Sequence, residues 1–478
     1  MYNYEMLLYD TGDKNVKKIP SPIEKPCLTF YACGPTVYDN THVGHMRRYV
    51  MDDVLKRTLL FLGYKVAHVI NITDVGHLTG DDDSGEDKLE RGALQKGKTV
   101  WDVAQEYEDQ FWKTMSALNI DKKEIIILNA TKNVKEMIKM IEILEDKGYT
   151  YETKEAVYFD TSKFKQYGAL SGQNLTDKRQ GAREDVKIDK DKRHPADFSL
   201  WFKRVGRFAN HTMHWESPWG TGFPGWHIEC SAMAMKGLST ETIDIHSGGI
   251  DHIPVHHENE IAQSEAFSGK KFVNWWVHHA FLQVDGEKMS KSKNNFYTLN
   301  DVLQKNIDPL TLRYFFLQAN YRKPMNFTWA AVEAASKSYR ELVEFYHSIQ
   351  KSNKKITSEN LSGGAHFFIK SFTEKLENDL NTAGALAEIF YMIKSKDISD
   401  SEKKYLLELF DSVLGLKFTD SEKVSVKIPT KILVLAEKRL AARKNKDFGL
   451  SDYLRNEILR LGFTIEDKEE GYEIKKIQ

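Results

Sequence analysis

The stretch that decides the fold runs from Leu28-Thr29-Phe30-Tyr31-Ala32 to His42-Val43-Gly44-His45. The first segment is an apolar run typical of a buried strand, and a helix-like stretch from Arg47 to Leu62 follows the second. The two histidines therefore lie where a strand ends and a helix begins, the junction at which α/β sheets bind nucleotides. Gly44 has no side chain, so an adenine ring can lie against the backbone there. The imidazoles can donate hydrogen bonds to a phosphate near the helix N-terminus.

A second segment, Lys288-Met289-Ser290-Lys291-Ser292, lies a domain's length further along the chain. It belongs to a Ser-rich, Gly-flanked stretch from Asp285 to Asn295, which is typical of a mobile loop. Chemistry between a carboxylate and ATP requires positioning and stabilisation of the charge that builds on the α-phosphate. Lysines in a closing loop provide positive donors on the side opposite the histidines. Each segment alone is also typical of ordinary solvated polar residues, so the prediction depends on finding both in this order.

Together the two segments resemble the HIGH and KMSKS signatures of class I aminoacyl-tRNA synthetases. The resemblance implies an α/β fold with a Rossmann-like catalytic domain. It also implies catalytic roles for His42, His45, Lys288 and Lys291. The implied ATP-binding set is His42, Gly44, His45, Gly248, Gly249, Lys288 and Lys291.

The cysteine count limits any metal site. The chain has 3 cysteines, Cys27, Cys33 and Cys230, so a four-cysteine zinc site is impossible and other ligand types are needed. The segment from His256 to Ala262 looks helical, and residues four apart share a helix face, which pairs His256 with Glu260. Two cysteines with one histidine and one glutamate would suit tetrahedral zinc. Spacing is equally compatible with His257, or with His252 and His256, and the cysteines also fit a role as small buried apolar residues.

Three segments sharpen the resemblance to one family, the cysteinyl-tRNA synthetases. They are Tyr31 to Asp39, Pro224 to Met233 and Pro254 to Glu260. The resemblance extends over nearly the whole chain and implies one zinc ion per chain. Its ligands are then Cys33, Cys230, His256 and Glu260.

The substrate gives a physical reason for such a metal. Cysteine and serine differ by one atom, and an apolar pocket separates such near-isosteres by only ~10²-fold. Zinc holds a soft thiolate strongly and deprotonates a thiol whose pKa is otherwise about 8.5, whereas a serine hydroxyl cannot compete. We expect the substrate thiolate to bind zinc directly, which would make a separate editing site unnecessary.

The family resemblance implies further substrate-binding positions. They are Gly34, Thr73, Trp226, His246 and Asp251. The chain departs from the family pattern after Thr73-Asp74, where an acidic stretch, Asp81 to Asp87, follows. Clustered like charge is usually an exposed loop, and a divalent-cation site is the less favoured alternative. Ser247 stands where glycine is common and Phe448 where tryptophan is usual, and neither removes a charge or a ligand.

Composition indicates a globular protein of several modules. The chain has 478 residues, 41% hydrophobic and 29% charged, with a formal net charge of -1. RNA contact then depends on local basic patches. No apolar run of membrane-spanning length is present, and Met1 to Met6 lacks the features of a signal peptide, so we expect a cytoplasmic protein without a membrane partner. Few cysteines suit a reducing compartment, and Cys27 is expected to be an ordinary thiol.

The pattern along the chain, read together with the family resemblance, predicts six parts, and the resemblance implies the role of each. We expect the first half of the catalytic domain at 1–130, a connective insertion at 131–217, the second half at 218–275, the lysine loop with a stem-contact fold at 276–335, a helical bundle at 336–425, and an anticodon-binding region at 426–478. Leu433 to Leu461 has helical spacing, with a strand-like segment after Gly462. A basic cluster on it is a candidate for tRNA phosphates, although such residues usually form a solvated face. Its members are Lys438, Arg439, Arg443, Lys444 and Lys446.

The family resemblance therefore implies an enzyme that ligates L-cysteine to its tRNA through a cysteinyl-adenylate, with ATP and Mg²⁺, acting as a monomer. A ligase that transfers cysteine from the same adenylate to an amino sugar is the nearer alternative. Relatives of that kind lack a tRNA-reading tail, so Leu433 to Gln478 disfavours it. A catalytically idle paralogue that binds RNA or stores zinc is a second alternative. The intact pairs His42 with His45 and Lys288 with Lys291 disfavour that reading.

Overall fold

The structure, a computed structural model, describes residues 5–76, 87–172, 189–290, 293, 295–349, 356–419, 430–445, 447–468 and 471–476. The chain divides into two compact units. The first contains residues 1–339 and 349–417, and the second contains 340–348 and 418–478. Within the described residues, no helix has the length and apolarity needed to cross a bilayer.

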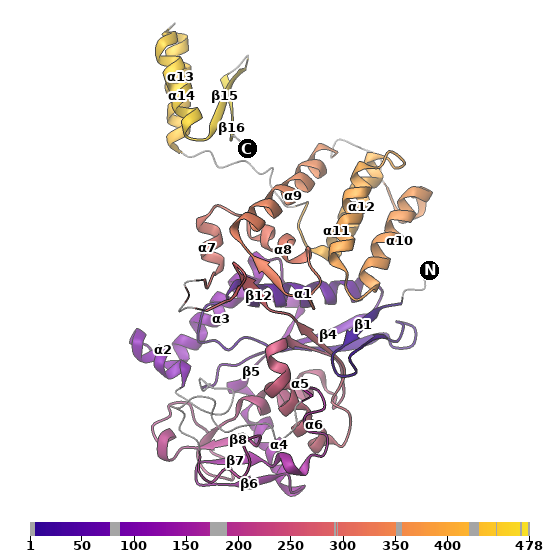
Figure 1. Cartoon of the computed structure of the whole chain (residues 1–478), viewed down its shortest axis with the longest axis vertical. Helices are drawn as coiled ribbons and strands as arrows, with labels where there is room; N and C mark the ends of the chain where they lie inside the picture. The colour runs from indigo at the N-terminus through magenta and orange to yellow at the C-terminus, as the bar shows by residue number, and fades with distance from the viewer. Residues whose placement is uncertain are drawn as a thin grey trace. The chain divides into compact units, whose positions relative to one another are not determined.

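A parallel sheet forms the centre of the first unit (Figure 1). Its strands, in spatial order, are β11 (Val273–His279), β10 (Ile243–Gly249), β3 (Cys27–Ala32), β4 (Lys65–Ile72) and β5 (Ile126–Asn129). Chain order reverses between β3 and β10, because β4 lies on one side of β3 and β10 on the other. The crevice at the carboxyl ends of these two strands is where open α/β sheets bind ligands.

Helices connect the parallel strands. They are α1 (Val43–Phe61), α2 (Lys88–Lys96), α3 (Val100–Ala117), α5 (Trp226–Leu238) and α6 (Glu258–Ser268). The helix predicted from Arg47 to Leu62 is present, but it begins four residues earlier, at Val43, because the His42 side chain caps it. His45 therefore lies inside the helix. The hairpin of β1 (Leu7–Asp10) and β2 (Asn15–Lys18) lies beside the edge strand β11, where Asp10 Oδ1 accepts a hydrogen bond from the Trp276 backbone N–H at 2.8 Å.

A separate antiparallel sheet occupies the predicted insertion. It contains β6 (Thr150–Glu152), β7 (Ala156–Phe159), β8 (Phe198–Lys203) and β9 (Gly222–Pro224), and α4 (Val134–Asp146) packs with it. Met137, Ile141, Phe198 and Trp201 are buried together in this core. The predicted boundaries at residues 217 and 275 do not coincide with the ends of the sheets. Strand β9, which pairs with β8, begins after residue 217, and β11, which pairs with β10, continues past residue 275. Backbone pairing extends each sheet beyond the apolar runs visible in the sequence.

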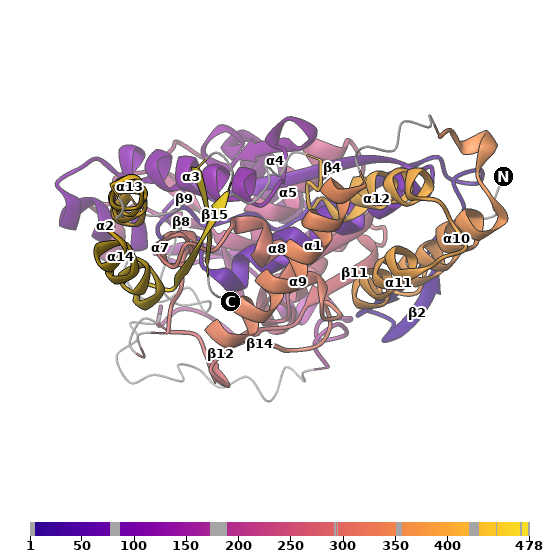
Figure 2. The ribbon, with the colours of Figure 1, turned by 90° about the horizontal axis from the view of Figure 1, so that it is seen from above.

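The lysine loop leaves a three-stranded sheet of β12 (Leu282–Val284), β13 (Glu287–Lys288) and β14 (Met325–Phe327). The helices that follow are α7 (Leu299–Gln304), α8 (Pro309–Leu317) and α9 (Trp329–Ser348), and then α10 (Gly363–Glu377), α11 (Thr382–Lys394) and α12 (Asp400–Leu414). Figure 2 shows α10 and α11 side by side. Apolar residues such as Phe372, Ile389 and Phe410 are buried in this group of helices.

The described part of the second unit contains α13 (Thr430–Lys444), α14 (Phe448–Arg460), β15 (Phe463–Lys468) and β16 (Gly471–Lys476). The helical spacing predicted from Leu433 to Leu461 is confirmed and corresponds to two helices, because Asp447 begins a new helix by accepting the Leu450 N–H at 3.0 Å. Arg439 of the predicted basic cluster is buried and paired in two contacts with Asp467, at 2.6 and 3.0 Å. It therefore stabilises this unit instead of facing a phosphate. Lys446 lies outside the described residues.

Candidate functional site

Four predicted ligands meet at the carboxyl ends of β3 and β10. One donor atom from each of Cys33, Cys230, His256 and Glu260 lies within 4.8 Å of the others, and all four residues are buried. Cys33 follows β3 and Cys230 lies on α5. His256 lies in the π-helical turn Ile253–His257 that leads into α6, and Glu260 lies in the first turn of α6. His256 Nε2 is 2.9 Å from Glu260 Oε1, as the predicted spacing of four residues requires.

Electrostatics in this cluster suit a bound cation. Burial raises the pKa of the Cys33 thiol. The hydrogen bond with Cys33, together with burial, raises the pKa of Cys230 well above its usual value. Burial also opposes charge on His256, but the nearby Cys230 and Glu260 raise the pKa of its imidazole. Burial likewise opposes charge on Glu260, but His246 and His256 lower the pKa of its carboxyl group. Glu260 Oε1 lies 2.9 Å from His256 Nε2, but this contact lacks hydrogen-bond geometry, so the oxygen accepts no hydrogen bond among the described residues. Two thiols, an imidazole and a carboxylate with a free lone pair form the kind of donor set that tetrahedral zinc takes.

A second group shares two of these residues. Cys33 and Glu260 also lie within 4.8 Å of His246 and His257. His246 Nε2 is 3.0 Å from Glu260 Oε2, and Cys33 Sγ is 3.4 Å from His257 Nε2. Both imidazole rings stack or tilt against the indole of Trp276, with centroids 4.5 and 4.7 Å apart. His246 therefore orients Glu260 through its Oε2 atom. His257 remains an alternative metal ligand by geometry, as it was by sequence spacing.

Sequence reasoning missed His227. Its Nδ1 lies 2.9 Å from His256 Nδ1, and the residue is buried. Because metal-binding histidines are held by a partner on the other ring nitrogen, His227 orients the imidazole of His256. The signal was present, since residues 227 and 230 are three apart on a helix and share a face.

Predicted pocket residues surround the cluster. The Trp226 indole stacks on the His256 imidazole, with centroids 4.3 Å apart. Thr73 is buried at the end of β4, and its Oγ1 accepts a hydrogen bond from Asn71 Nδ2 at 3.2 Å. The Gly34 N–H donates to Asn71 Oδ1 at 2.6 Å. A Cβ on Gly34 would lie 1.4 Å from the Asn71 carbonyl oxygen, so only glycine fits at this position.

Gly248 and Gly249 allow close packing at the end of β10. A Cβ on Gly248 would lie 2.5 Å from the His257 ring, and one on Gly249 would lie 2.2 Å from the Asp251 carboxylate. Asp251 itself is exposed. Its carboxylate is near enough to His42 to raise the pKa of that imidazole slightly against the larger effect of burial. The end of β10 therefore connects the candidate metal-ligand cluster to the start of α1.

The predicted nucleotide-binding histidines lie at the first turn of α1. His42 Nδ1 accepts hydrogen bonds from the backbone N–H groups of Gly44 and His45, at 3.1 and 3.3 Å. The two imidazole rings stack with centroids 3.6 Å apart. Burial lowers the pKa of His42 to about 4, so the ring is neutral at pH 7 and its proton is on Nε2, away from the helix. A Cβ on Gly44 would lie 2.9 Å from the His42 ring, a packing reason for this glycine that the sequence did not reveal.

The lysine loop lies beside this helix start. Lys288 is exposed, and its Nζ is 5.6 Å from the Phe281 ring centroid. Met289 Cε would be 3.4 Å from a Cβ on Gly44, and the Val43 N–H donates to the Tyr297 carbonyl at 2.9 Å. Lys291 lies outside the described residues. Of the acidic stretch, Asp81 to Glu86 also lie outside them, and Asp87 caps α2.

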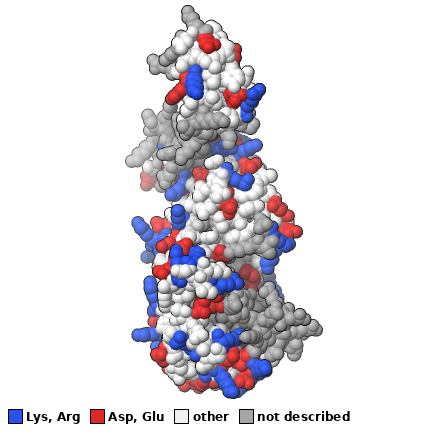
Figure 3. All heavy atoms as spheres, turned by 90° about the vertical axis from the view of Figure 1, so that its left-hand side faces the viewer, with Lys and Arg blue, Asp and Glu red and all other residues white. Residues whose placement is uncertain are grey.

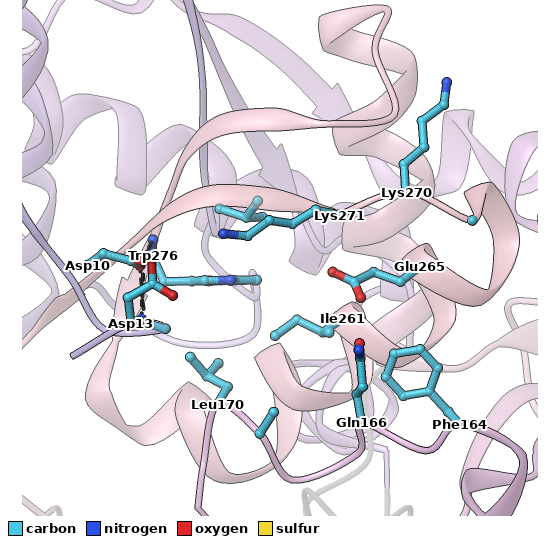
Figure 4. A pocket seen from close by; sticks show the side chains of 14 residues that line it. Asp10, Asp13, Phe164, Gln166, Leu170, Ile261, Glu265, Lys270, Lys271 and Trp276 are labelled. Atoms are coloured by element: carbon cyan, nitrogen blue, oxygen red, sulfur yellow. Dashed lines mark hydrogen bonds between the residues drawn. The ribbon is translucent and has the colours of Figure 1, made fainter. Parts of the chain in front are cut away.

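A cavity of about 630 Å³ opens on the other side of Trp276 (Figure 4). Lys271 and Glu265 line it, with apolar residues such as Leu170 and Ile261. The cavity contains none of the predicted site residues, and the Trp276 side chain lies between it and the imidazoles of His246 and His257. The cavity is therefore separate from the predicted site residues.

Comparison with known proteins identifies the class. Residues 19–337 match the family described as tRNA synthetases class I (C) catalytic domain. The fold is similar to that of LeuRS from Agrobacterium radiobacter K84, solved in a ternary complex with tRNA and LeuAMS. The TM-score is 0.58 at 12% identity, over 82% of this chain and 84% of that one. The parallel sheet, the two histidines at the start of α1 and the lysine loop agree with these matches. Together they form the catalytic core of a class I aminoacyl-tRNA synthetase.

Two curated relatives identify the family. A cysteine–tRNA ligase from Treponema denticola is 42% identical over 95% of this chain and 96% of its own length. One from Borrelia garinii subsp. bavariensis is 38% identical over 98% and 99%. The chain belongs to the cysteine–tRNA ligase family, as the sequence resemblance implied.

Proposed function

We propose that the chain joins L-cysteine to its cognate tRNA in two steps, and that a zinc ion on Cys33, Cys230, His256 and Glu260 selects the cysteine. In the first step, the cysteine carboxylate attacks the α-phosphorus of ATP, and cysteinyl-adenylate forms as pyrophosphate leaves. In the second, a hydroxyl of the 3′-terminal ribose of tRNA attacks the acyl carbon and releases AMP. The observation that carries the zinc proposal is the convergence of four buried donor atoms within 4.8 Å of one another.

Zinc in this cluster would bind the substrate thiolate, which a serine hydroxyl matches poorly. The chain's own residues supply the remaining selectivity. Trp226 stacks on His256 and Thr73 lies buried nearby, so both support the proposed wall around a short side chain. His227 and His246 hold the outer atoms of His256 and Glu260, which supports a rigid donor set.

Charge stabilisation is assigned to the residues at the start of α1 and in the lysine loop. A neutral His42 whose Nδ1 is occupied by backbone N–H groups can only donate through Nε2, which suits a hydrogen bond to a phosphate oxygen. The exposed ammonium of Lys288 would attract the departing pyrophosphate, and we assign Lys291 and His45 the same kind of role. Gly44, Gly248 and Gly249 keep the backbone accessible to adenosine, and Gly34 and Asp251 face the amino acid.

Further parts of the proposal concern the whole enzyme. We assign ATP a Mg²⁺ partner and the chain a monomeric state in the cytoplasm. We keep the division into catalytic halves, insertion, stem-contact fold, bundle and anticodon-binding tail. The antiparallel sheet β6–β9 supports the insertion, and the separate compact unit at 418–478 supports the tail. Gel filtration with light scattering tests the monomer.

The deciding experiment compares Cys230→Ser with Cys27→Ser. Cys230 is buried in the cluster, whereas Cys27 is an exposed thiol outside it, so the same chemical change is made in two environments. We expect Cys230→Ser to lose bound zinc, measured by metal analysis, and to lose at least ~10²-fold in cysteine-dependent pyrophosphate exchange. Cys27→Ser should retain both.

Three results would change the proposal. Full activity of Cys230→Ser without zinc would refute metal selection and leave the synthetase assignment intact. Equal charging of tRNA with serine by the unaltered enzyme would also refute metal selection. Adenylate formation without tRNA charging would move the assignment to the amino-sugar ligase.

A further inference from the structure

Arg47 is a buried cation without an acidic partner. It lies in the second turn of α1, two residues after His45, and its side chain is 2% exposed. Within the described residues it forms no salt bridge, and burial lowers its pKa to about 10, which leaves it charged at pH 7. Burying such a charge is costly unless hydrogen bonds compensate for the lost hydration, so the contacts of the guanidinium must offset this cost.

Carbonyl oxygens alone compensate this charge. One terminal nitrogen, Nη1, donates to the carbonyls of Ala280 and Phe281 at 3.1 and 3.4 Å. The other, Nη2, donates to the carbonyls of Asn320 and Lys323 at 3.0 and 2.8 Å. The planar guanidinium presents its donors in a fixed fork, which a lysine ammonium cannot reproduce.

These carbonyls belong to the two chain segments that support the lysine loop. Ala280 and Phe281 connect β11 to β12, and Asn320 to Lys323 connect α8 to β14. The segments also bond to each other, from the Ala280 N–H to Tyr321 O at 2.9 Å and from the Met325 N–H to Phe281 O at 3.2 Å. β12 pairs with β14 and with β13, which carries Lys288. Arg47 therefore holds the base of the sheet from which the lysine loop leaves.

The same helix holds the other end of the loop. The Val43 N–H donates to Tyr297 O at 2.9 Å, and His42 pairs with Thr298 as an isolated antiparallel bridge. The loop is thus attached to α1 at its beginning through Arg47 and at its end through Val43. His45 lies between these two attachments in the chain, and His42 immediately precedes Val43, so the separation of both histidines from Lys288 depends on the attachments.

We infer that Arg47 is a positioning residue for adenylate formation, because it fixes the base of the Lys288-bearing sheet against the helix that carries His42 and His45. This inference rests on the proposed roles of those three residues. It assigns Arg47 no contact with substrate. Arg47 acts by fixing the positions of the side chains that donate to the charged α-phosphate. Small displacements of such groups reduce the reaction rate steeply.

The test uses Arg47→Lys with Arg313→Lys as a matched control. Arg313 is also buried and donates to the carbonyls of Leu414 and Leu118, at 2.6 and 2.9 Å. It also pairs with Asp53 of α1 at 2.5 Å, but none of its partners belongs to the two segments that support the lysine loop. Arg47→Gln, which keeps two N–H donors, is the second variant in case Arg47→Lys does not fold. For each variant we would measure pyrophosphate exchange against ATP and against cysteine, bound zinc, and melting temperature.

For Arg47→Lys we expect kcat for exchange to fall ~10- to 100-fold, with the KM for cysteine within about two-fold of the unaltered enzyme and zinc retained. Arg313→Lys should lose as much melting temperature and keep kcat. A second readout is tryptic cleavage at Lys288, Lys291 and Lys293. ATP with cysteine should protect this loop in the unaltered enzyme and in Arg313→Lys, and should protect it poorly in Arg47→Lys.

Unchanged kcat and protection in Arg47→Lys would overturn the inference, as would losses equal to those in Arg313→Lys. Failure of the proposed function would be distinguishable, because the unaltered enzyme itself would then show no cysteine-dependent exchange.

Discussion

The His42 imidazole combines two tasks, each on a different nitrogen. Nδ1 caps α1 by accepting two backbone N–H groups, and Nε2 remains to donate. Because burial lowers the pKa of this ring to about 4, the donor is present over the whole neutral range. The depressed pKa also means that its contribution to stability is complete above about pH 6.5 and is lost as the pH falls toward 4.

Two substitutions separate these tasks. Asparagine is a good helix cap, so His42→Asn should keep the free energy of unfolding and still lose ~10²-fold in adenylate formation, because it lacks the outward donor. His42→Ala should lose the same activity and also about 1 kcal/mol of stability. Pyrophosphate exchange and urea unfolding measure the two effects. Equal activity of His42→Asn and the unaltered enzyme would show that capping is the only role of this histidine.

Two glycines provide a matched pair for packing. A Cβ on Gly34 would overlap the Asn71 carbonyl oxygen, whereas one on Gly92, within α2, would meet only Val103 Cγ1 at 3.7 Å. We expect Gly34→Ala to lose at least ~3 kcal/mol or to fail to fold, since backbone must move. Gly92→Ala should gain up to about 1 kcal/mol from helix propensity. Urea unfolding of both variants is the measurement, and a stable Gly34→Ala would contradict the described packing of Gly34 against Asn71.

At the level of elements, a buried ion pair joins the start of α2 to the segment before β9. His211 Nε2 lies 2.8 Å from Asp87 Oδ2, and both residues are buried. Burial alone would lower the pKa of His211, but the hydrogen bond and the charge of Asp87 raise it above its usual value. His211 also stacks on Phe223 of β9, with centroids 3.9 Å apart.

A raised histidine pKa predicts stability that falls with rising pH. The contribution of His211 is complete below about pH 6.5 and is lost as the pH rises through its raised folded-state pKa, because the folded protein binds the proton more tightly there. The slope for one proton approaches ~1.4 kcal/mol per pH unit. Urea unfolding from pH 5.5 to 8.5 should show this component in the unaltered protein and lack it in His211→Gln. Identical slopes would rule it out.

At the scale of the whole molecule, the chain separates activation chemistry from the tail. Every described residue of the proposed active site lies in the first unit, and α13 to β16 form part of the second. Figure 3 shows a face on which Lys and Arg are interspersed with Asp and Glu, in agreement with a net charge of -1. Binding of tRNA must then depend on local groups of basic side chains.

This division predicts different phenotypes for adjacent residues of α13. Arg439→Ala removes the buried partner of Asp467 and should destabilise the second unit by ~2 kcal/mol, which reduces tRNA charging. Lys438 is exposed, so Lys438→Ala should leave folding unchanged and weaken tRNA binding only modestly. Both variants should retain pyrophosphate exchange. Loss of exchange in Arg439→Ala would show that activation depends on the tail.

Much of this protein followed from short-range sequence patterns. The apolar run before His42, the helix after it, and the four-residue spacing of His256 and Glu260 specify local structure, because helix and strand periodicity place side chains on definite faces. The family was also readable, since its signature residues stand next to one another in the chain. These features depend on neighbours within a few residues.

Only the tertiary structure decided which distant groups meet. The family resemblance implied that Cys33 and Cys230 lie at one site, and the packing of α5 against β3 brings the two free thiols together. The tertiary structure also placed His227 and His246 against the candidate ligands and Arg439 against Asp467. It also surrounded Arg47 with four carbonyl oxygens, which carry no residue identity and therefore leave no signal in the sequence. The physical reason is that burial and hydrogen bonding between segments far apart depend on how the whole chain packs, whereas periodicity reports only on each segment's own face.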